Sequence, residues 1–169
     1  MISYIFLILN FLFLILVFYL TLAFITGAPY VPTRNDTAVK MLEFSDIKPG
    51  MKVYDLGSGD GKLLFMAAKN GAVATGFEIN PYLVILTNIR ALVTTNKNVK
   101  AVWKNFWHAD LKDADVVYVY LLPWRMKQLD TMLKKNLKKR SLVISNSFIF
   151  PDWKIEKQDP DAHVYTFRV

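Results

Sequence analysis

The chain has 169 residues, a formal net charge of +7 at pH 7, two histidines and no cysteine. This length has room for one folded domain, and the lack of cysteine excludes disulfides, thiolate nucleophiles and cysteine-ligated zinc. Because His108 and His163 lie far apart in the sequence, we expect no metal site.

The first predicted element is an apolar segment over residues 2–26, ISYIFLILNFLFLILVFYLTLAFIT. It exceeds the roughly 20 apolar residues that cross a bilayer, so we predict one transmembrane helix and an anchor over residues 1–27. A cleaved signal peptide is the alternative, but no Lys or Arg precedes the run, which is longer than the roughly 7–15 residues of a signal-peptide core. Basic residues follow from Arg34 onward, so the positive-inside rule predicts a single-pass membrane protein with a cytoplasmic catalytic domain.

Residues 28–36 are predicted to form a proline-containing linker, and residues 37–169 a domain in which helices and strands alternate. Helices are expected over residues 35–44, 61–70, 80–95 and 124–137, with Asp36 and Asn80 as N-caps of the first and third. Strands are expected over residues 51–56, 72–78, 99–103, 115–122 and 141–148, followed by two strands around the turn at 159–161. The predicted fold is therefore an α/β, Rossmann-like, doubly wound and mostly parallel sheet with a C-terminal antiparallel hairpin.

Three glycines at alternate positions follow the first strand of the domain, in VYDLGSGDGKLL. The spacing differs from the dinucleotide fingerprint, because Lys62 follows Gly61 and no glycine stands at the sixth place. A strand, a glycine loop and a helix place backbone N–H groups at the carboxyl edge of the sheet, where open α/β sheets bind ligands. Glu78 ends the next strand about 20 residues later, the separation at which an acid reaches ribose hydroxyls. The loop is therefore predicted to hold a nucleoside.

The charges beside the loop indicate which nucleoside is bound. Asp55 and Asp60 flank the glycines, and Lys62 is followed by Leu63 where a phosphate-binding P-loop has Ser or Thr. Two carboxylates suit a cationic ligand, such as the sulfonium and α-ammonium groups of S-adenosylmethionine. The competing interpretation is a plain strand-to-helix turn, but such a turn needs one glycine and not three.

Several motifs together resemble a known family. VYDLGSGDGK resembles motif I of the class I, or seven-β-strand, S-adenosylmethionine-dependent methyltransferases, and GFEINPYLV resembles their second motif. With PYVPT, WKNFW and FPDW, the chain is similar to small membrane-anchored lysine methyltransferases that modify the ATP synthase c subunit and the adenine nucleotide translocase. The resemblance runs from about Pro29 to Trp153. It implies transfer of a methyl group to lysine in a membrane or membrane-proximal protein.

The resemblance also implies the contacts of the cofactor. The ribose would lie against Glu78, and the adenine against Asn105 and Phe106. The methionine part would lie against Asp55, Gly57, Ser58, Gly59 and Gly61. Asn105 stands where the family often has an aspartate, and its side-chain carbonyl can accept the same hydrogen bond from adenine. Tyr30 and Thr33 in PYVPT either fold over the cofactor mouth or belong to a plain linker.

The acceptor pocket is predicted in YVYLLPW, after the fourth strand of the domain. Tyr120 and Trp124 are the predicted acceptor residues, and Tyr118 is a weaker candidate because alternate tyrosines on a strand usually pack in the core. No general base is needed, because an apolar pocket lowers the pKa of lysine.

Two questions stay open in the sequence. The basic run at residues 127–140 suits an anionic membrane surface or a solvated helix face, and we expect no nucleic-acid partner. A small-molecule or lipid acceptor is an alternative to lysine, and a non-catalytic membrane-anchored interaction module is the alternative to an enzyme.

Overall fold

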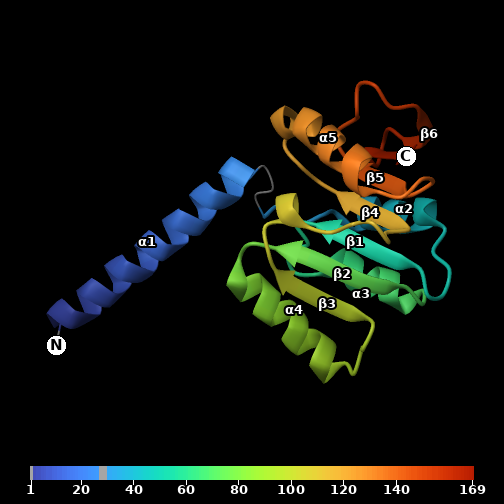
Figure 1. Cartoon of the computed structure of the whole chain (residues 1–169). Helices are drawn as coiled ribbons and strands as arrows, with labels where there is room; N and C mark the ends of the chain where they lie inside the picture. The colour runs from blue at the N-terminus through green and yellow to red at the C-terminus, as the bar shows by residue number, and fades with distance from the viewer. Residues whose placement is uncertain (1, 27–29) are drawn as a thin grey trace.

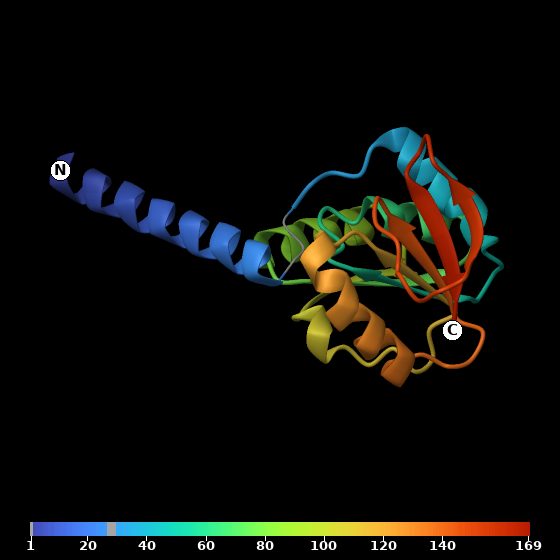
Figure 2. The ribbon, with the colours of Figure 1, turned by 90° about the horizontal axis from the view of Figure 1, so that it is seen from above.

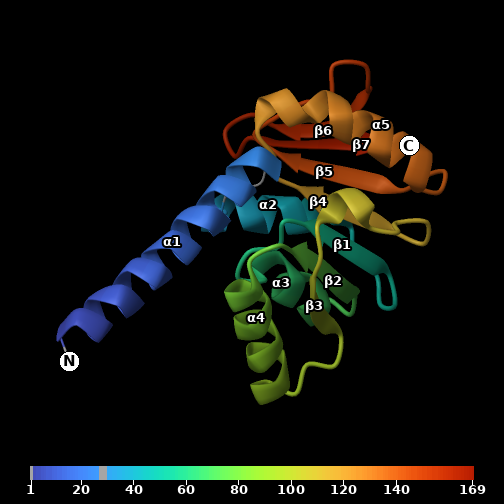
Figure 3. The ribbon, with the colours of Figure 1, turned by 60° about the vertical axis from the view of Figure 1, so that its left-hand side comes forward.

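A computed structural model describes residues 2–26 and 30–169 of the chain. An N-terminal helix, α1 (Ile2–Thr26), extends away from an α/β body and meets it only near its C-terminal end (Figures 1 and 3). Residues 27–29, where the predicted anchor meets the predicted linker, lie outside the described residues. The predicted boundaries between anchor, linker and domain stay predictions.

The body is built on one mixed sheet whose seven strands follow the order β3-β2-β1-β4-β5-β7-β6. The first five strands in this order are parallel, and β7 runs antiparallel to both β5 and β6. The predicted parallel sheet with a C-terminal antiparallel hairpin is therefore confirmed. The strands are β1 (Lys52–Leu56), β2 (Val73–Glu78), β3 (Val99–Trp103), β4 (Val116–Val119), β5 (Leu142–Asn146), β6 (Ile155–Asp159) and β7 (Val164–Arg168).

Helices cover both faces of the sheet, as a doubly wound fold requires. One face packs against α2 (Asn35–Ser45), α3 (Lys62–Lys69) and α4 (Pro81–Val93), and the other against α5 (Met126–Asn136). Figure 2 shows α2 and α5 on opposite sides of the sheet. Two short 3-10 helices, η1 (Phe106–His108) and η2 (Pro123–Arg125), follow the carboxyl ends of β3 and β4. The carboxyl edge of the parallel strands therefore carries most of the predicted site residues.

The two predicted helix caps have different outcomes. Asn80 is the N-cap of α4, because its side chain accepts a hydrogen bond from the Tyr82 N–H, and Pro81 follows at the first helical position. We predicted Asp36 as the cap of α2, but the N-cap position is Arg34, two residues earlier, and the helix begins at Asn35. Asp36 lies inside the first turn, where it accepts the Thr37 N–H and pairs with Arg34 at 2.5 Å. An acid in a first turn still favours the helix through the dipole.

The prediction of a membrane anchor needs a correction. The apolar segment is helical over the predicted residues, and many of its described side chains are well exposed. In the part of the chain that the structure describes, however, no helix meets the length and apolarity of a membrane span. The predicted transmembrane helix, the single-pass membrane location with a cytoplasmic domain and the bilayer contact through this helix are therefore not upheld.

Candidate functional site

The glycine loop joins β1 to α3 and is tied to the neighbouring strand. The N–H groups of Gly57 and Ser58 both donate to the carbonyl of Phe77 in β2, at 2.9 and 3.1 Å. Gly59 has a φ of +55°, and a Cβ placed there would lie 2.9 Å from the Tyr30 ring. Glycine is therefore needed at this position both for the backbone conformation and for the close contact.

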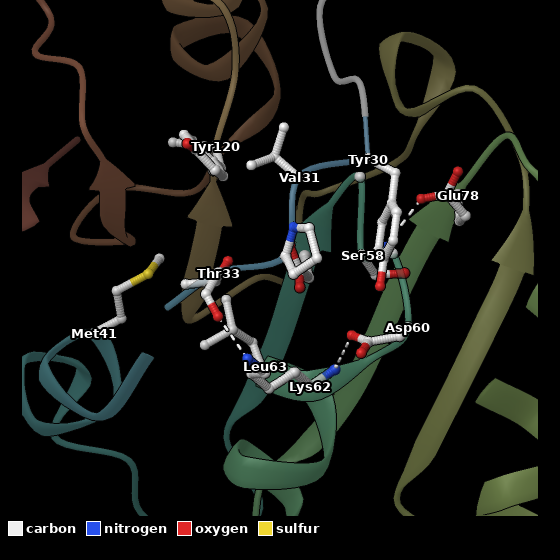
Figure 4. Close-up of a pocket in the computed structure, with 15 residues that line it drawn as sticks. Tyr30, Val31, Thr33, Met41, Ser58, Asp60, Lys62, Leu63, Glu78 and Tyr120 are labelled. Atoms are coloured by element: carbon white, nitrogen blue, oxygen red, sulfur yellow. Dashed lines mark hydrogen bonds between the residues drawn. The ribbon is translucent and has the colours of Figure 1, made fainter. Parts of the chain in front are cut away.

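A cavity lies between the loop and residues 30–33, a segment that we call the N-terminal strap. The cavity encloses about 40 Å³ and reaches from the glycine loop to the ends of β2 and β4 (Figure 4). Of the predicted site residues, it is lined by Asp55, Gly57, Ser58, Gly59, Glu78 and Tyr120. The fold thus brings residues from three strands and one loop to a single place.

Glu78 holds the loop in shape. Its side chain is buried, and its two carboxylate oxygens accept the N–H groups of Gly59 at 2.9 Å and Asn80 at 2.8 Å. Burial raises the pKa of Glu78, although these backbone donors oppose the rise. Because each carboxylate oxygen can accept more than one hydrogen bond, Glu78 keeps capacity for donors from a ligand.

Asp55 is the most strongly perturbed carboxylate of the cavity. Burial, with the negative charges of Glu78 and Asp60 adding to it, raises the pKa of Asp55 to about 7. Lys62 also lines the cavity, but its Nζ donates to the carbonyl of Thr33 at 2.5 Å and to Oδ1 of Asn35 at 3.2 Å. The lining thus holds three carboxyl groups against the single positive charge of Lys62, and a cationic ligand would favour the ionised form of Asp55.

The donor set of the cavity fits the predicted cofactor. The Ser58 hydroxyl is buried beside Gly76 of β2 and has no hydrogen-bond partner among the described residues, and Ser58 is part of the cavity lining. A sulfonium and an ammonium suit the carboxylates, and a ribose suits the remaining acceptor capacity of Glu78. The residues present thus match the polarity and the charge of S-adenosylmethionine.

The N-terminal strap covers the glycine loop, as the first of the two interpretations of PYVPT predicted. Tyr30 lies against Gly59, and Thr33 is held by Lys62 (Figure 4). The enclosed volume is far below the roughly 300–1,000 Å³ of small-molecule sites. A ligand the size of a nucleoside therefore requires the strap or the Tyr30 ring to move. Sequence reasoning missed Lys62, since nothing in the local pattern shows that it reaches back to residues 33 and 35.

The predicted adenine residues lie beside the cavity and not in its lining. Asn105 caps η1 by accepting the Trp107 N–H at 3.1 Å, and Phe106 is buried. The chain leading to Asn105 is tied to the end of β2, because the Lys104 N–H donates to the carbonyl of Glu78 at 3.0 Å. Gly61, with a φ of +76°, begins α3 at its N-cap position and also lies outside the lining.

The three aromatic candidates for the acceptor pocket separate in the structure. Tyr120 lines the cavity, whereas Trp124 lies outside it on η2, where its ring contacts Phe24 of α1 at 5.4 Å between centroids. Tyr118 points into the core, is fully buried and donates its hydroxyl to Ser45 at 3.0 Å. Tyr118 is therefore a packing residue, and its suggested part in an acceptor pocket is wrong.

Comparison with known proteins points to one enzyme family. Residues 55–157 match the family model described as the ANTKMT methyltransferase domain. A protein-lysine N-methyltransferase of Saccharolobus islandicus (strain REY15A) is 33% identical over 156 residues, which cover 86% of this chain and 96% of that protein. The lysine N-methyltransferase of the ATP synthase c subunit from Xenopus laevis is 32% identical over 126 residues, which cover 74% of this chain and 55% of that protein. The match thus spans only about half of the Xenopus protein.

A solved structure resembles the chain over most of its length. It is an RNA methyltransferase from Salinibacter ruber in complex with S-adenosyl-L-homocysteine. The TM-score is 0.78 at 32% sequence identity, and the match covers 82% of this chain and 94% of that one.

Proposed function

The chain belongs to the family of ANTKMT methyltransferase domains, and we propose that it transfers a methyl group from S-adenosylmethionine to the side-chain amine of lysine in a protein. The enzyme class is that of the S-adenosylmethionine-dependent methyltransferases. The observation that carries the lysine proposal is the 33% identity that extends over nearly the whole of a protein-lysine N-methyltransferase.

The residues around the cavity would share the binding of the cofactor. When bound, S-adenosylmethionine supplies a methyl group activated by its positively charged sulfur. Asp55 opposes the positive charge of the methionine part, and Glu78 accepts the ribose hydroxyls. The Ser58 hydroxyl bonds a polar group of the ligand, and Asn105 accepts from the adenine amino group beside Phe106. Gly57 and Gly59 keep the lining of the cavity free of side chains that would fill the ligand's space. Gly61 lies outside the lining, and a Cβ there would lie 2.7 Å from the Thr87 side chain.

Tyr120 and Trp124 are our candidates for the acceptor side. Tyr120 lies on the other side of the cavity from Glu78, at the carboxyl end of β4 (Figure 4). An aromatic wall at this place attracts the methylated cationic product and guides the lysine stem, while exclusion of water favours the neutral amine. The chain's main task is then alignment, because methyl transfer is an in-line displacement that gains most from positioning.

The target protein would be one that presents lysine beside an apolar surface, as a membrane-embedded or membrane-proximal protein does. The exposed apolar side chains of α1 support this proposal, because α1 ends beside η2 and Trp124. The Xenopus relative is named for methylation of the ATP synthase c subunit. RNA is the second candidate acceptor, favoured by the activity for which the Salinibacter protein is named and by the basic charge of the chain.

The test uses purified chain, radiolabelled S-adenosylmethionine, and fractions of cellular protein or RNA. We expect label in protein, at lysine when the labelled peptides are sequenced by mass spectrometry. Glu78→Gln should weaken cofactor affinity about tenfold or more, because a hydrogen bond to a charged acceptor contributes roughly 1.5–3 kcal/mol.

Glu43→Gln is the matched control, because Glu43 lies on the exposed side of α2 and pairs with Lys40. Label only in RNA would replace the lysine proposal by the second candidate. Unchanged affinity in Glu78→Gln would place the ribose elsewhere.

A further inference from the structure

A second cavity, of about 300 Å³, lies at the edge of the sheet opposite the glycine loop. Its lining includes the residues at or just before the amino ends of β1, β4 and β5, namely Met51, Val116 and Leu142. The end of α2, the turn before β5 and the hairpin of β6 and β7 complete the walls. We call it the amino-edge cavity. It shares no lining residue with the first cavity, and its volume is at the lower end of the range for small-molecule sites.

Positive charge is in excess around the amino-edge cavity. Its lining contains five cationic side chains and three carboxylates. Lys138 pairs with Asp115 at 2.6 Å, and Arg168 pairs with Glu156 at 2.9 Å. Within residues 2–26 and 30–169, no carboxylate lies within ion-pair distance of the other three cations, which are Lys139, Arg140 and Lys157. The third carboxylate, Asp46, has only Lys48 near it, at 3.9 Å.

The turn that carries two of these cations is held firmly in place. The Arg140 N–H donates to the main-chain oxygen of Val169, and the Arg140 carbonyl accepts from Nη1 of Arg168, each at 2.8 Å. The next residue, Ser141, donates its hydroxyl to the carbonyl of Ala114 at 2.8 Å. Arg140 itself has a φ of +73°, which a non-glycine residue adopts only when the surrounding contacts enforce it. The cationic turn is therefore set before any ligand arrives, which lowers the cost of binding.

Lys157 faces the same cavity from a separate element. Its backbone N–H donates to the buried Thr166 hydroxyl at 2.9 Å, which joins β6 to β7 at this point. Its Nζ lies 6.0 Å from the centroid of the Phe44 ring, on the wall formed by α2. Cations from the α5–β5 turn and from β6 thus converge on one hollow.

We propose that the amino-edge cavity binds the phosphate group of a small molecule, with Arg140 and Lys157 as its main contacts. The lining has two more positive than negative side chains, and a phosphate monoester carries a charge of about −1.5 to −2 at neutral pH. A guanidinium binds two phosphate oxygens at once, and an ammonium adds a compact charge. This site is separate from the proposed methyl-transfer site and does not depend on that proposal.

The test is a titration of the full chain with inorganic phosphate and with phenyl phosphate, at constant ionic strength, followed by NMR of ¹⁵N-labelled protein. We expect saturable shifts at residues 138–141, 157 and 44–46. The double variant Arg140→Gln/Lys157→Gln should weaken binding at least about tenfold, because each lost bond is charge-assisted. If phenyl phosphate binds more tightly than inorganic phosphate, the ligand of the cavity is a phosphate monoester. If inorganic phosphate binds more tightly, the ligand is the free ion.

The control is Lys127→Gln/Lys135→Gln, which removes the same charge from α5, outside the lining of the amino-edge cavity. It should bind both probes like the natural chain. S-adenosylmethionine affinity should be the same in all three proteins, which shows that they are folded. Equal phosphate affinity in the two double variants, shifts confined to the glycine loop, or no saturable binding of either probe would overturn the proposal.

Discussion

Glu78 ends β2, Asp55 lies one residue before the end of the neighbouring β1, and both side chains are buried, with the charge of Glu78 acting on Asp55. Glu78 has two backbone donors, whereas burial and neighbouring acids dominate the surroundings of Asp55. The positions of both residues were predictable, because a strand followed by a glycine loop fixes what stands at the sheet edge. The different surroundings that set their pKa values were not predictable, because these depend on how closely β1, β2 and the loop approach one another. For Tyr118 the sequence favoured core packing and kept the acceptor role as the weaker possibility, because only the fold shows which face of β4 it occupies.

The pKa of Asp55 predicts how stability depends on pH. Its pKa is about 7 in the folded chain against 3.8 in the unfolded chain, so this group stabilises the fold fully below about pH 4. The contribution, on the order of 4 kcal/mol, is lost as the pH rises through about 7. We expect the free energy of unfolding of the ligand-free chain to fall between about pH 4 and pH 7 and to level off above that. Asp55→Asn should remove most of this fall, as measured by urea denaturation across that range.

Asp152→Asn is the control, because Asp152 is exposed and belongs to neither cavity discussed above. This variant should keep the pH dependence of the natural chain. Saturating S-adenosylmethionine should reduce the loss of stability at high pH, since a cation beside Asp55 favours its ionised form. The same pH dependence in Asp55→Asn and in the natural chain would mean that another group is responsible.

Among the elements, strand and helix positions followed closely from local signals, while contacts between distant segments did not. The strand at residues 99–103 was predicted with its observed ends, and Asn80 with Pro81 marked the start of α4. The helix before β5 was expected from residue 124, but its first part forms η2. The strap was foreseen only as one of two possibilities, because its contact with Gly59 and its bond to Lys62 join segments about 30 residues apart.

The bond between Lys62 and the strap should control how fast the cofactor enters and leaves. Lys62→Met keeps the apolar stem and removes the donor to Thr33 and Asn35. We expect cofactor association and dissociation both to become several-fold faster, because the strap opens more easily without a charged hydrogen bond worth roughly 1.5–3 kcal/mol at most. Since both rates rise together, their ratio, the Kd, should change less. Stopped-flow fluorescence measures both rates.

Lys69→Met, a substitution in the last turn of the same helix, should leave both rates unchanged. Amide hydrogen exchange at Tyr30, Val31 and Thr33 should rise in Lys62→Met alone. If both rates stay at the natural values while exchange rises, the strap does not limit access to the cavity.

At the scale of the whole molecule, α1 and the α/β body differ in how they are stabilised. The body has a buried core on each face of its sheet, whereas α1 is exposed over much of its described length. Composition predicted the helix correctly, because its residues are apolar and uninterrupted by proline or glycine. The same composition led to the prediction of a membrane anchor, which was wrong, because no helix among the described residues is long and apolar enough to cross a membrane. At its C-terminal end, α1 contacts the Trp124 ring through Phe24, and Arg125 donates to the Ile25 carbonyl. No local sequence pattern predicts these contacts, because they join segments about 100 residues apart.

The last prediction is that α1 recruits the target and contributes little to cofactor binding. None of the described side chains of α1 lines the first cavity, and the C-terminal end of α1 lies beside Trp124 on the proposed acceptor side. Deleting residues 1–27 while keeping PYVPT should therefore leave the Kd for S-adenosylmethionine nearly unchanged. Methylation of the native target at cellular enzyme concentration should fall about tenfold or more, since a tethering contact raises effective concentration by large factors. Calorimetry and initial rates with radiolabelled cofactor measure the two quantities.

A short peptide that contains the target lysine separates recruitment from damage to the active site. The truncated and full chains should methylate this peptide equally fast, because it is too short to engage α1. The variant Phe24→Ala, which removes only the ring contact with Trp124, should retain most of the activity on the native target if the exposed surface of α1 does the recruiting. Equal rates of the truncated and full chains on the native target would show that α1 does not select it, and the acceptor would then have to be sought from Tyr120 and Trp124 alone.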